Sequence, residues 1–547
     1  MEDIRVSSEY DRYLSPLDVW AIAFGCAIGW GAFMMPGSTF LPVAGPLGTA
    51  IAMAISVVIM LVIGANFFYL MRNRPGTGGV YAYTKGAFGR EHAFLCAWFL
   101  SLSYLTVLFM NATSLFLVIR MVFGRRLQYG YYYYNIAGNH IFMGEVGASI
   151  VALASVGLLF VNAKPLLQRL QTILAIVLLA CVALVAAICL PRLRLEIPKD
   201  AFGIGGVSPA FGILSIVMLA PWAFVGFEVI SLETAHFDFK IRRSRWIILA
   251  SILLGGIVYV ALTLVAVTAA PDGYGSWQAY ITDLPQLNGV SAVPTFFSAK
   301  AVMGNIGLLI MALAALAAIL TGMIAAYRAT SRVLATMAED NILSERFSRT
   351  TYSILFVMVI SIVISIFGRN MLQCFMELTS LGAIIGFGYT SASAWQLARK
   401  KGNRRFAVLG ALGTVISVAF LLVQLIPGVT ALETMGADAF LLLTVWCLLG
   451  FIFYLITVAR SSATKAMGSS AAGLTLFALL LYSALMWLGK RLMAADSLDA
   501  VHAILHREGL IMLVMVFTGL ALTLHIQRLQ RRKGANRTVQ DAPREAD

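Results

Sequence analysis

Charged residues are scarce in this chain. They make up 12% of its 547 residues, about half the share typical of soluble domains, whereas hydrophobic residues account for 60%. This composition excludes a soluble globular protein and indicates a membrane protein that crosses the bilayer many times. No polar stretch is long enough to insert a soluble domain between the apolar segments.

Cysteine and histidine are also sparse, with six residues of each. All six cysteines lie inside apolar segments and none has C-x-x-C spacing, so the sequence offers no disulfide framework and no thiolate metal site. The histidines are scattered, mainly near loop ends, which argues against an enzyme embedded in the membrane. We therefore expect no metal, no cofactor and no enzymatic activity. The cysteines are Cys26, Cys96, Cys181, Cys189, Cys374 and Cys447, and the histidines are His92, His140, His236, His502, His506 and His525.

Channel signatures are missing too, because neither a repeated pore loop nor rings of like residues occur. The net charge of +14 raises the question of nucleic acid binding. However, both termini and the loops on one predicted side of the membrane hold 29 of the 40 Lys and Arg residues, and the opposite loops hold 11. The positive-inside rule explains this asymmetry and places both termini in the cytoplasm. We expect no nucleic-acid partner.

Apolar runs fill most of the chain. A helix needs about 20 mostly apolar residues to cross the bilayer, and by that measure the sequence predicts an all-α protein with fourteen spans. They lie at residues 16–42, 45–71, 93–122, 146–162, 166–190, 208–235, 246–270, 301–330, 351–368, 372–397, 406–426, 438–459, 470–489 and 508–526. The charged tail after residue 526 has a composition that predicts disorder.

Two of these spans are interrupted by backbone-breaking residues. The first span contains GCAIGWGAFMMPG (Gly25–Gly37), and the sixth contains APWAFVGFE (Ala220–Glu228). Hydrocarbon offers no hydrogen-bond partners, so a broken helix is tolerated only where the freed groups face protein, water or a ligand. Interrupted spans at matching positions, five spans apart, predict two inverted repeats with a binding site between the breaks.

This pattern divides the chain into five parts. They are a cytoplasmic N-terminus (1–15), a first repeat of five spans (16–190), a second repeat of five spans (208–400), four peripheral spans (401–526) and a cytoplasmic tail (527–547).

Four motifs in this chain resemble those of the amino acid–polyamine–organocation transporter superfamily. IGWGAFMMPG in span one is similar to the family pattern G-x-G-[IA]-F-x-x-P-G, and WAFVGFE in span six is similar to its F-A-F-x-G-F-E variant. RPGTGGVYAYTKGAFG after span two and ATSRVLATMAEDNILSERF after span eight resemble its loop motifs, with Ser344 in place of the family's proline. The resemblance covers about residues 16 to 400. It implies a LeuT-like fold of five-plus-five inverted repeats and alternating access around a site near the bilayer midplane.

The broken spans carry groups suited to an α-amino acid. Amides freed around Gly29 and Gly31 form a carboxylate site that a ligand can approach closely, because glycine has no side chain. Carbonyls freed around residues 223–226 accept hydrogen bonds from an ammonium group. The alternative is that these glycines only let helices pack closely. The expected substrate-binding residues are Ile28, Gly29, Trp30, Gly31, Trp222, Ala223, Phe224 and Gly226.

Aromatic residues flank both breaks. In the family, an aromatic residue at this point of span six commonly covers the substrate, which makes Trp222 and Phe224 candidate gates. Trp30 stands where many relatives carry a small polar residue, and its indole either shrinks the site or acts as a lid. Ordinary packing is the alternative for each of them.

Polar residues inside the spans are candidates for coupling or gating, because such groups are costly in hydrocarbon. Glu228 either holds the unwound segment through backbone amides or titrates during transport. Glu377 lies near the outer interface, where ordinary solvation explains it. Thr321 either joins a sodium-like site or bonds back to its own helix. Tyr104 and Asn111 either line the site or bridge helices.

The coupling ion stays open between H⁺ and Na⁺. In proton-coupled relatives, a lysine in span five substitutes for a sodium ion. Aligning Gln171 with the family's glutamine puts Leu178 at that position, and no lysine lies between residues 165 and 191. Lysine-mediated proton coupling is therefore disfavoured, and exchange or facilitated transport gains weight.

Together these observations predict a secondary active transporter for an amino acid or a related small amine, located in the cytoplasmic membrane. The apolar and aromatic pocket favours a neutral or hydrophobic amino acid. The alternatives are an exchanger of polyamines, organic cations or cationic amino acids, which Glu377 and the fourteen spans favour, and a sensor built on a transporter fold. The expected partners are the small-molecule substrate and the lipid bilayer.

Overall fold

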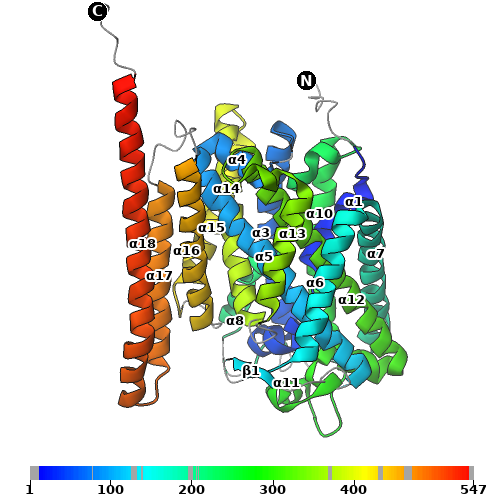
Figure 1. Ribbon diagram of the computed structural model, residues 1–547. Coiled ribbons are helices and arrows are strands. Elements are labelled where there is room, and N and C mark those ends of the chain that lie inside the picture. The colour runs from blue at the N-terminus through cyan, green and yellow to red at the C-terminus, as the bar shows by residue number, and fades with distance from the viewer. Residues whose placement is uncertain are drawn as a thin grey trace, which may run out of the picture.

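The computed structural model describes residues 12–76, 78–124, 132–136, 139–194, 201–204, 206, 208–366, 372–428, 435–460 and 471–540. These residues form a bundle of long helices in which α1 (Pro16–Ala27) begins and α18 (Leu498–Gln540) ends at the same end (Figure 1). We call this the terminal end. The opposite end carries α11 (Trp277–Thr282) and an antiparallel hairpin of β1 (Tyr132–Ile136) and β2 (Asn139–Phe142). The hairpin departs from the all-α prediction.

Each of the fourteen predicted spans contains helical structure. Among the described residues, ten segments are long and apolar enough to cross a membrane, and the bent pair in span six makes an eleventh. Fourteen crossings therefore stays a prediction. The long helices besides α1 and α18 are α3 (Leu41–Asn73), α5 (Arg90–Phe123), α6 (Met143–Asn162), α7 (Lys164–Cys189), α10 (Ser244–Ala266), α12 (Pro294–Glu339), α13 (Thr350–Ser365), α14 (Leu372–Lys400), α15 (Arg404–Leu425), α16 (Ala437–Arg460) and α17 (Ala471–Met493). Besides α11, the shorter helices outside spans one and six are one α-helix, α4 (Gly79–Phe88), and five 3₁₀ helices. The 3₁₀ helices are η3 (Leu190–Arg192), η5 (Ile241–Arg243), η6 (Leu284–Gln286), η7 (Gly289–Ala292) and η8 (Glu345–Ser348).

The start of α1 is fixed by a capping box. The Ser15 hydroxyl accepts a hydrogen bond from the Asp18 amide at 3.3 Å, and the Asp18 carboxylate accepts one from the Ser15 amide at 3.1 Å. Pro16 occupies the first helical position, where a missing N–H costs nothing. The first span therefore begins at a defined residue at the terminal end.

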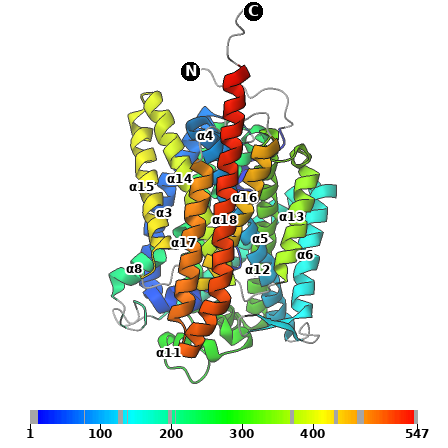
Figure 2. The ribbon, with the colours of Figure 1, turned by 60° about the vertical axis from the view of Figure 1, so that its left-hand side comes forward.

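The strongest helix contacts in the core join spans that are far apart in the sequence. α5 packs against α12 and α14, α3 packs against α10, and α7 packs against α1 and α12. α15 packs against α14 and α3. α16, α17 and α18 pack together on one side of the bundle, at its left edge in Figure 1 and in front of the other helices in Figure 2. The site predicted between the breaks thus lies inside the part formed by α1 to α14.

The composition of the tail after residue 526 predicted disorder, but the first part of the tail is helical. α18 continues to Gln540. Arginine, lysine, glutamine and leucine all have high helix propensity, so the RLQRRK stretch continues a helix that the preceding apolar span has already nucleated.

Candidate substrate site

The first break separates α1 from α2 (Gly31–Met35), and its residues 28–30 lie between the two helices. Ile28 adopts an extended conformation with φ −105° and ψ 100°. The Trp30 amide donates a long hydrogen bond of 3.4 Å to the side-chain oxygen of Asn111. The amides of Gly29 and Gly31 have no acceptor among the described residues. Two backbone donors are therefore left without a protein acceptor at this break.

The second break lies inside the interrupted segment predicted at residues 220–228. Span six consists of α8 (Pro209–Val217), α9 (Ala220–Phe224) and the 3₁₀ helix η4 (Phe227–His236). The chain turns at Val225 and at Gly226, whose φ of +127° is strained for any residue with a side chain. Ala223 lies within α9, and its amide bonds to the Leu219 carbonyl at 2.9 Å. The break is thus at Val225–Gly226, and Ala223 lies in the helix before it.

The two breaks touch each other directly. A Cβ on Gly226 would lie 2.6 Å from the Cβ of Cys26 and 2.7 Å from the amide nitrogen of Ala27. These distances are shorter than any normal contact, so only glycine fits. The Gly226 amide donates to the Glu228 carboxylate at 2.7 Å, which satisfies the donor that the turn exposes. Glu228 is buried and holds the second break in shape.

A cavity of about 340 Å³ borders both breaks. Its wall combines the first break and α2, the adjoining π-helical turn η1 (Pro36–Phe40), α5, the second break, α10 and the start of α14. No Asp, Glu, Lys, Arg or His lines it among the described residues. The lining residues are Cys26, Ala27, Gly29, Trp30, Gly31, Met34, Met35, Ser38, Val107, Met110, Asn111, Ser114, Trp222, Val225, Tyr259, Leu372, Gln373 and Met376.

Trp222 lies against the first break. A Cβ on Gly31 would meet its ring atoms Cζ2 at 2.4 Å and Cη2 at 2.6 Å. Its ring centroid is 6.3 Å from that of Tyr259 on α10. The indole of span six therefore covers the second glycine of span one.

A model of the family described as amino acid permease matches residues 14–453 of the chain. The chain belongs to this amino acid permease family. The resemblance to the amino acid–polyamine–organocation superfamily is thereby confirmed, and the family is one of membrane transporters.

Two relatives of this chain are named for different substrates. The branched-chain amino acid permease BcaP of Lactococcus lactis is 22% identical over 408 residues, which cover 72% of this chain and 83% of BcaP. Cationic amino acid transporter 4 of Mus musculus is 21% identical over 424 residues, which cover 74% of this chain and 62% of that protein.

Two solved transporter structures are also similar. One is MHP1, a nucleobase-cation-symport-1 family transporter with bromovinylhydantoin bound, at a TM-score of 0.45 and 12% identity, covering 75% of this chain and 92% of that one. The other is a Na⁺-coupled sialic acid symporter, at a TM-score of 0.46 and 11% identity, covering 76% and 91%.

The predicted binding residues divide into two groups. Gly29, Trp30, Gly31 and Trp222 line the cavity. Trp30 also packs against Phe296 of α12, with ring centroids 5.9 Å apart, so its indole is part of the wall. The predicted residues that do not line the cavity are Ile28, Ala223, Phe224 and Gly226, all buried in the packing around the breaks.

The coupling and gating candidates lie outside the cavity wall. Thr321 bonds back to the carbonyls of Ala317 and Ala318, at 2.8 and 3.0 Å, and packs against Gly25. Glu377 is buried rather than solvated, and its carboxylate accepts a hydrogen bond from the Gly436 amide at 2.8 Å. Tyr104 is fully buried, and its hydroxyl interacts electrostatically with Glu228.

Asn111 has a larger role than its sequence context indicated. Its side chain is wedged between two glycines, because a Cβ on Gly29 would lie 2.9 Å from its oxygen and one on Gly322 would lie 2.8 Å from its nitrogen. It also accepts the Trp30 amide and donates to the Val107 carbonyl at 2.9 Å. A polar residue in mid-span was the signal for it.

Other wall residues carry no sequence signal. Tyr259 and Gln373 come from helices without a break, and the methionines of the wall resemble the many others in the chain. No group of three His, Cys, Asp or Glu residues in the described part of the chain is arranged to hold a metal ion.

Proposed function

We propose that this permease is a secondary active transporter for a neutral amino acid with an apolar side chain, bound in the cavity between the breaks. The uncharged, methionine-rich and aromatic wall carries this proposal, because an apolar side chain gains free energy by leaving water there. The amides of Gly29 and Gly31 supply the donors for the carboxylate, and carbonyls at Val225 supply acceptors for the ammonium group.

A cationic side chain or a polyamine is the second candidate, and one relative is a cationic amino acid transporter by name. A buried cation needs a partner of opposite charge or loses several kcal/mol. Glu377, which made this substrate attractive, does not line the cavity, and its two oxygens accept hydrogen bonds from the Gly436 amide and from the cavity residue Gln373. The neutral substrate is therefore preferred. A sensor on the same fold would bind the same ligand without moving it.

We further propose that spans one to ten form inverted repeats and operate by alternating access. Helices five spans apart pack against each other: α1 against η4, α3 against α10, and α5 against α12. Such pairs are expected on either side of a pseudo-twofold axis. The contact of Gly226 with Cys26 and Ala27 lies at the cavity wall, where the two repeats meet.

For the energy source, we propose transport without a lysine-based proton relay. Leu178 is fully buried at the position aligned with that lysine, and the Thr321 hydroxyl is engaged by its own helix. Exchange of one amino acid for another fits these observations. Uptake that depends on pH would indicate proton coupling through Glu228, and uptake that depends on sodium would indicate sodium coupling. Uptake that depends on internal substrate would indicate exchange.

Uptake into proteoliposomes tests the proposal. Wild-type protein is expected to take up labelled leucine faster than labelled lysine, and unlabelled leucine inside should accelerate exchange. Binding without uptake would identify a sensor, and a preference for lysine would overturn the substrate assignment.

The variant Asn111→Ala tests the location of the site. It removes the side chain that holds the first break, so we expect KM for leucine to rise about tenfold or more. Asn162→Ala is the matched control, because Asn162 makes the same bond to a carbonyl four residues earlier, Leu158, but is exposed and far along the chain from either break. Equal kinetics for the two variants would exclude this cavity.

A further inference from the structure

A second cavity opens near the terminal end, and it shares no lining residue with the substrate cavity. Its volume is about 580 Å³. It lies between the start of α1, the junction of α6 and α7, the end of η4 and the last turns of α12. Nothing in the proposed transport step uses it.

Positive charge predominates on the wall of this cavity. Four cationic side chains line it, against two carboxylates. The cations are Lys164, Arg169, Arg328 and Arg332, and the carboxylates are Asp18 and Glu233. Whether those carboxylates neutralise the cations depends on their hydrogen bonds.

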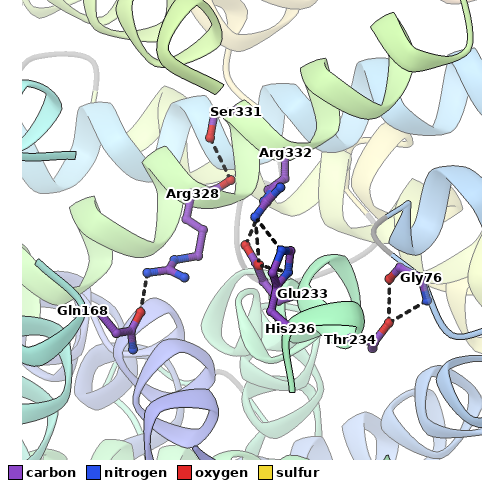
Figure 3. Close-up of polar contacts among 8 residues, drawn as sticks. All are labelled: Gly76, Gln168, Glu233, Thr234, His236, Arg328, Ser331 and Arg332. Carbon is purple, nitrogen blue, oxygen red and sulfur yellow. Dashed lines mark hydrogen bonds and ion pairs between the residues drawn. The ribbon is translucent and has the colours of Figure 1, made fainter. Parts of the chain in front are cut away.

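Both carboxylates already have hydrogen-bond partners, and only one of these partners is a cation of the wall. Glu233 accepts from Arg332 at 3.1 and 3.4 Å and lies 3.1 Å from a ring nitrogen of His236 (Figure 3). Asp18 accepts from hydroxyl groups, those of Thr172 at 2.6 Å and Ser15 at 2.7 Å. Arg332 is thus the one cation of the four that has an ion pair among the described residues.

Arg328 is a buried charge with no carboxylate within ion-pair distance among the described residues. It lies one helical turn before Arg332 and is 6% exposed. One terminal nitrogen donates to the neutral side-chain oxygen of Gln168, toward which Figure 3 shows it extending. Its Nε has no acceptor among the described residues, and its remaining contact is with the ring of Phe160 at 5.6 Å. An unpaired buried guanidinium is strongly destabilising, so an anion is the group this position lacks.

Lys164 and Arg169 extend the positive wall to the surface. Both are exposed and belong to the first turns of α7. Neither has an ion pair with an acidic residue in the described part of the chain. A guanidinium fork matches an oxyanion in bidentate fashion, and two further cations favour an anion with more than one negative charge.

We propose that this cavity binds a phosphate-type oxyanion, held by Arg328 and drawn in by Lys164 and Arg169. The bound anion bridges α7 of the first five spans and α12 of the next five, and so stabilises their present arrangement. Its phosphate group belongs either to a soluble phosphate compound or to the headgroup of an anionic lipid. This inference does not depend on which substrate is transported.

Thermal unfolding of the full-length protein in lipid nanodiscs tests the proposal and distinguishes the two sources. In one arm, inorganic phosphate is titrated at constant ionic strength into nanodiscs of phosphatidylcholine. In the other arm, phosphatidylglycerol replaces part of the lipid in phosphate-free buffer. We expect Tm to rise saturably by about 2 °C or more in at least one arm. A response in the first arm assigns a soluble anion, and a response in the second a lipid headgroup.

The variants Arg328→Gln and the pair Lys164→Gln with Arg169→Gln are expected to lose this rise. The surface pair keeps the test decisive if Arg328→Gln fails to fold. Arg242→Gln, an exposed arginine of η5 outside the cavity, is the control and should respond as wild type does. No rise in either arm, or the same rise in all variants, would overturn the proposal.

Discussion

Trp222 and Gly31 occupy adjoining space at the first break, and this contact changes how the glycine is understood. A Cβ at position 31 would overlap the indole at 2.4 Å before it reached a ligand. The glycine therefore has two separable roles, to admit the Trp222 ring and to present its amide. A single bulky substitution at Gly31 tests both roles at once.

A pair of variants separates these roles. Gly31→Ala alone should abolish uptake, because the new methyl group displaces Trp222. Trp222→Phe removes the two ring atoms that would collide with it, so Gly31→Ala combined with Trp222→Phe should recover a substantial part of the uptake of Trp222→Phe alone. Labelled-leucine uptake in proteoliposomes measures the effect. If the double variant stays as inactive as Gly31→Ala, the steric explanation is wrong and the backbone at Gly31 itself contacts the substrate.

The sequence located the glycines of the breaks better than it located the side chains that line the cavity. Backbone effects are local, so Gly29, Gly31 and Gly226 were recognised at or next to the breaks from their positions alone. Side-chain direction is not local, because an apolar helix gives no signal of which face meets which neighbour. Phe224 and Ala223 thus point into packing, whereas Tyr259 and Met376 face the cavity.

At the scale of elements, η4 is the unusual structure. It keeps 3₁₀ geometry over residues 227–236, although such helices seldom exceed four residues and long ones often mark hinges. Its first turn is fixed to the second break by the Glu228 carboxylate, which accepts the Gly226 amide. Its last turn carries Glu233, which is paired with Arg332 of α12. Both ends of the element are therefore tied by single carboxylates.

Substitutions at Glu228 test whether its bond or its charge matters. Glu228→Gln keeps an oxygen that accepts the Gly226 amide, so we expect a Tm close to that of wild type. Glu228→Ala leaves a buried amide without an acceptor and should cost about 1–3 kcal/mol of unfolding free energy. Thermal unfolding in detergent compares the two. Equal destabilisation of both variants would show that the charge, and not the acceptor oxygen, holds the element.

The same variant also tests proton coupling. If uptake by the wild type depends on pH and uptake by Glu228→Gln does not, proton coupling is assigned to this residue.

At the scale of the whole molecule, the two cavities differ in the charge of their walls. The substrate cavity has no charged wall residue, and the cavity near the terminal end is rich in arginine and lysine. This difference agrees with the excess of positive charge on the predicted cytoplasmic side. The orientation of the bundle in the membrane is therefore the global property most worth measuring.

Cysteine labelling measures this orientation. Five native cysteines are buried and Cys181 is partly buried, so the background reaction should be low. Gln286→Cys lies at the end that carries α11, and Lys400→Cys lies at the terminal end; both positions are exposed. With a membrane-impermeant maleimide, the first should react in intact cells and the second only after permeabilisation. The reverse pattern would place both termini outside the cytoplasm and contradict the charge rule.

The sequence by itself determined the membrane class, the family resemblance and the two broken spans. These properties follow from composition and from backbone chemistry, which act within a few residues. Only the tertiary structure decided that Gly226 packs on Cys26 and Ala27 and that Asn111 is wedged between Gly29 and Gly322. It also decided that Arg328 is buried with no carboxylate of the described residues within ion-pair distance. Each of these contacts depends on the rotation and depth of one apolar helix relative to another, and close packing between spans, not residue pattern along one span, sets that geometry.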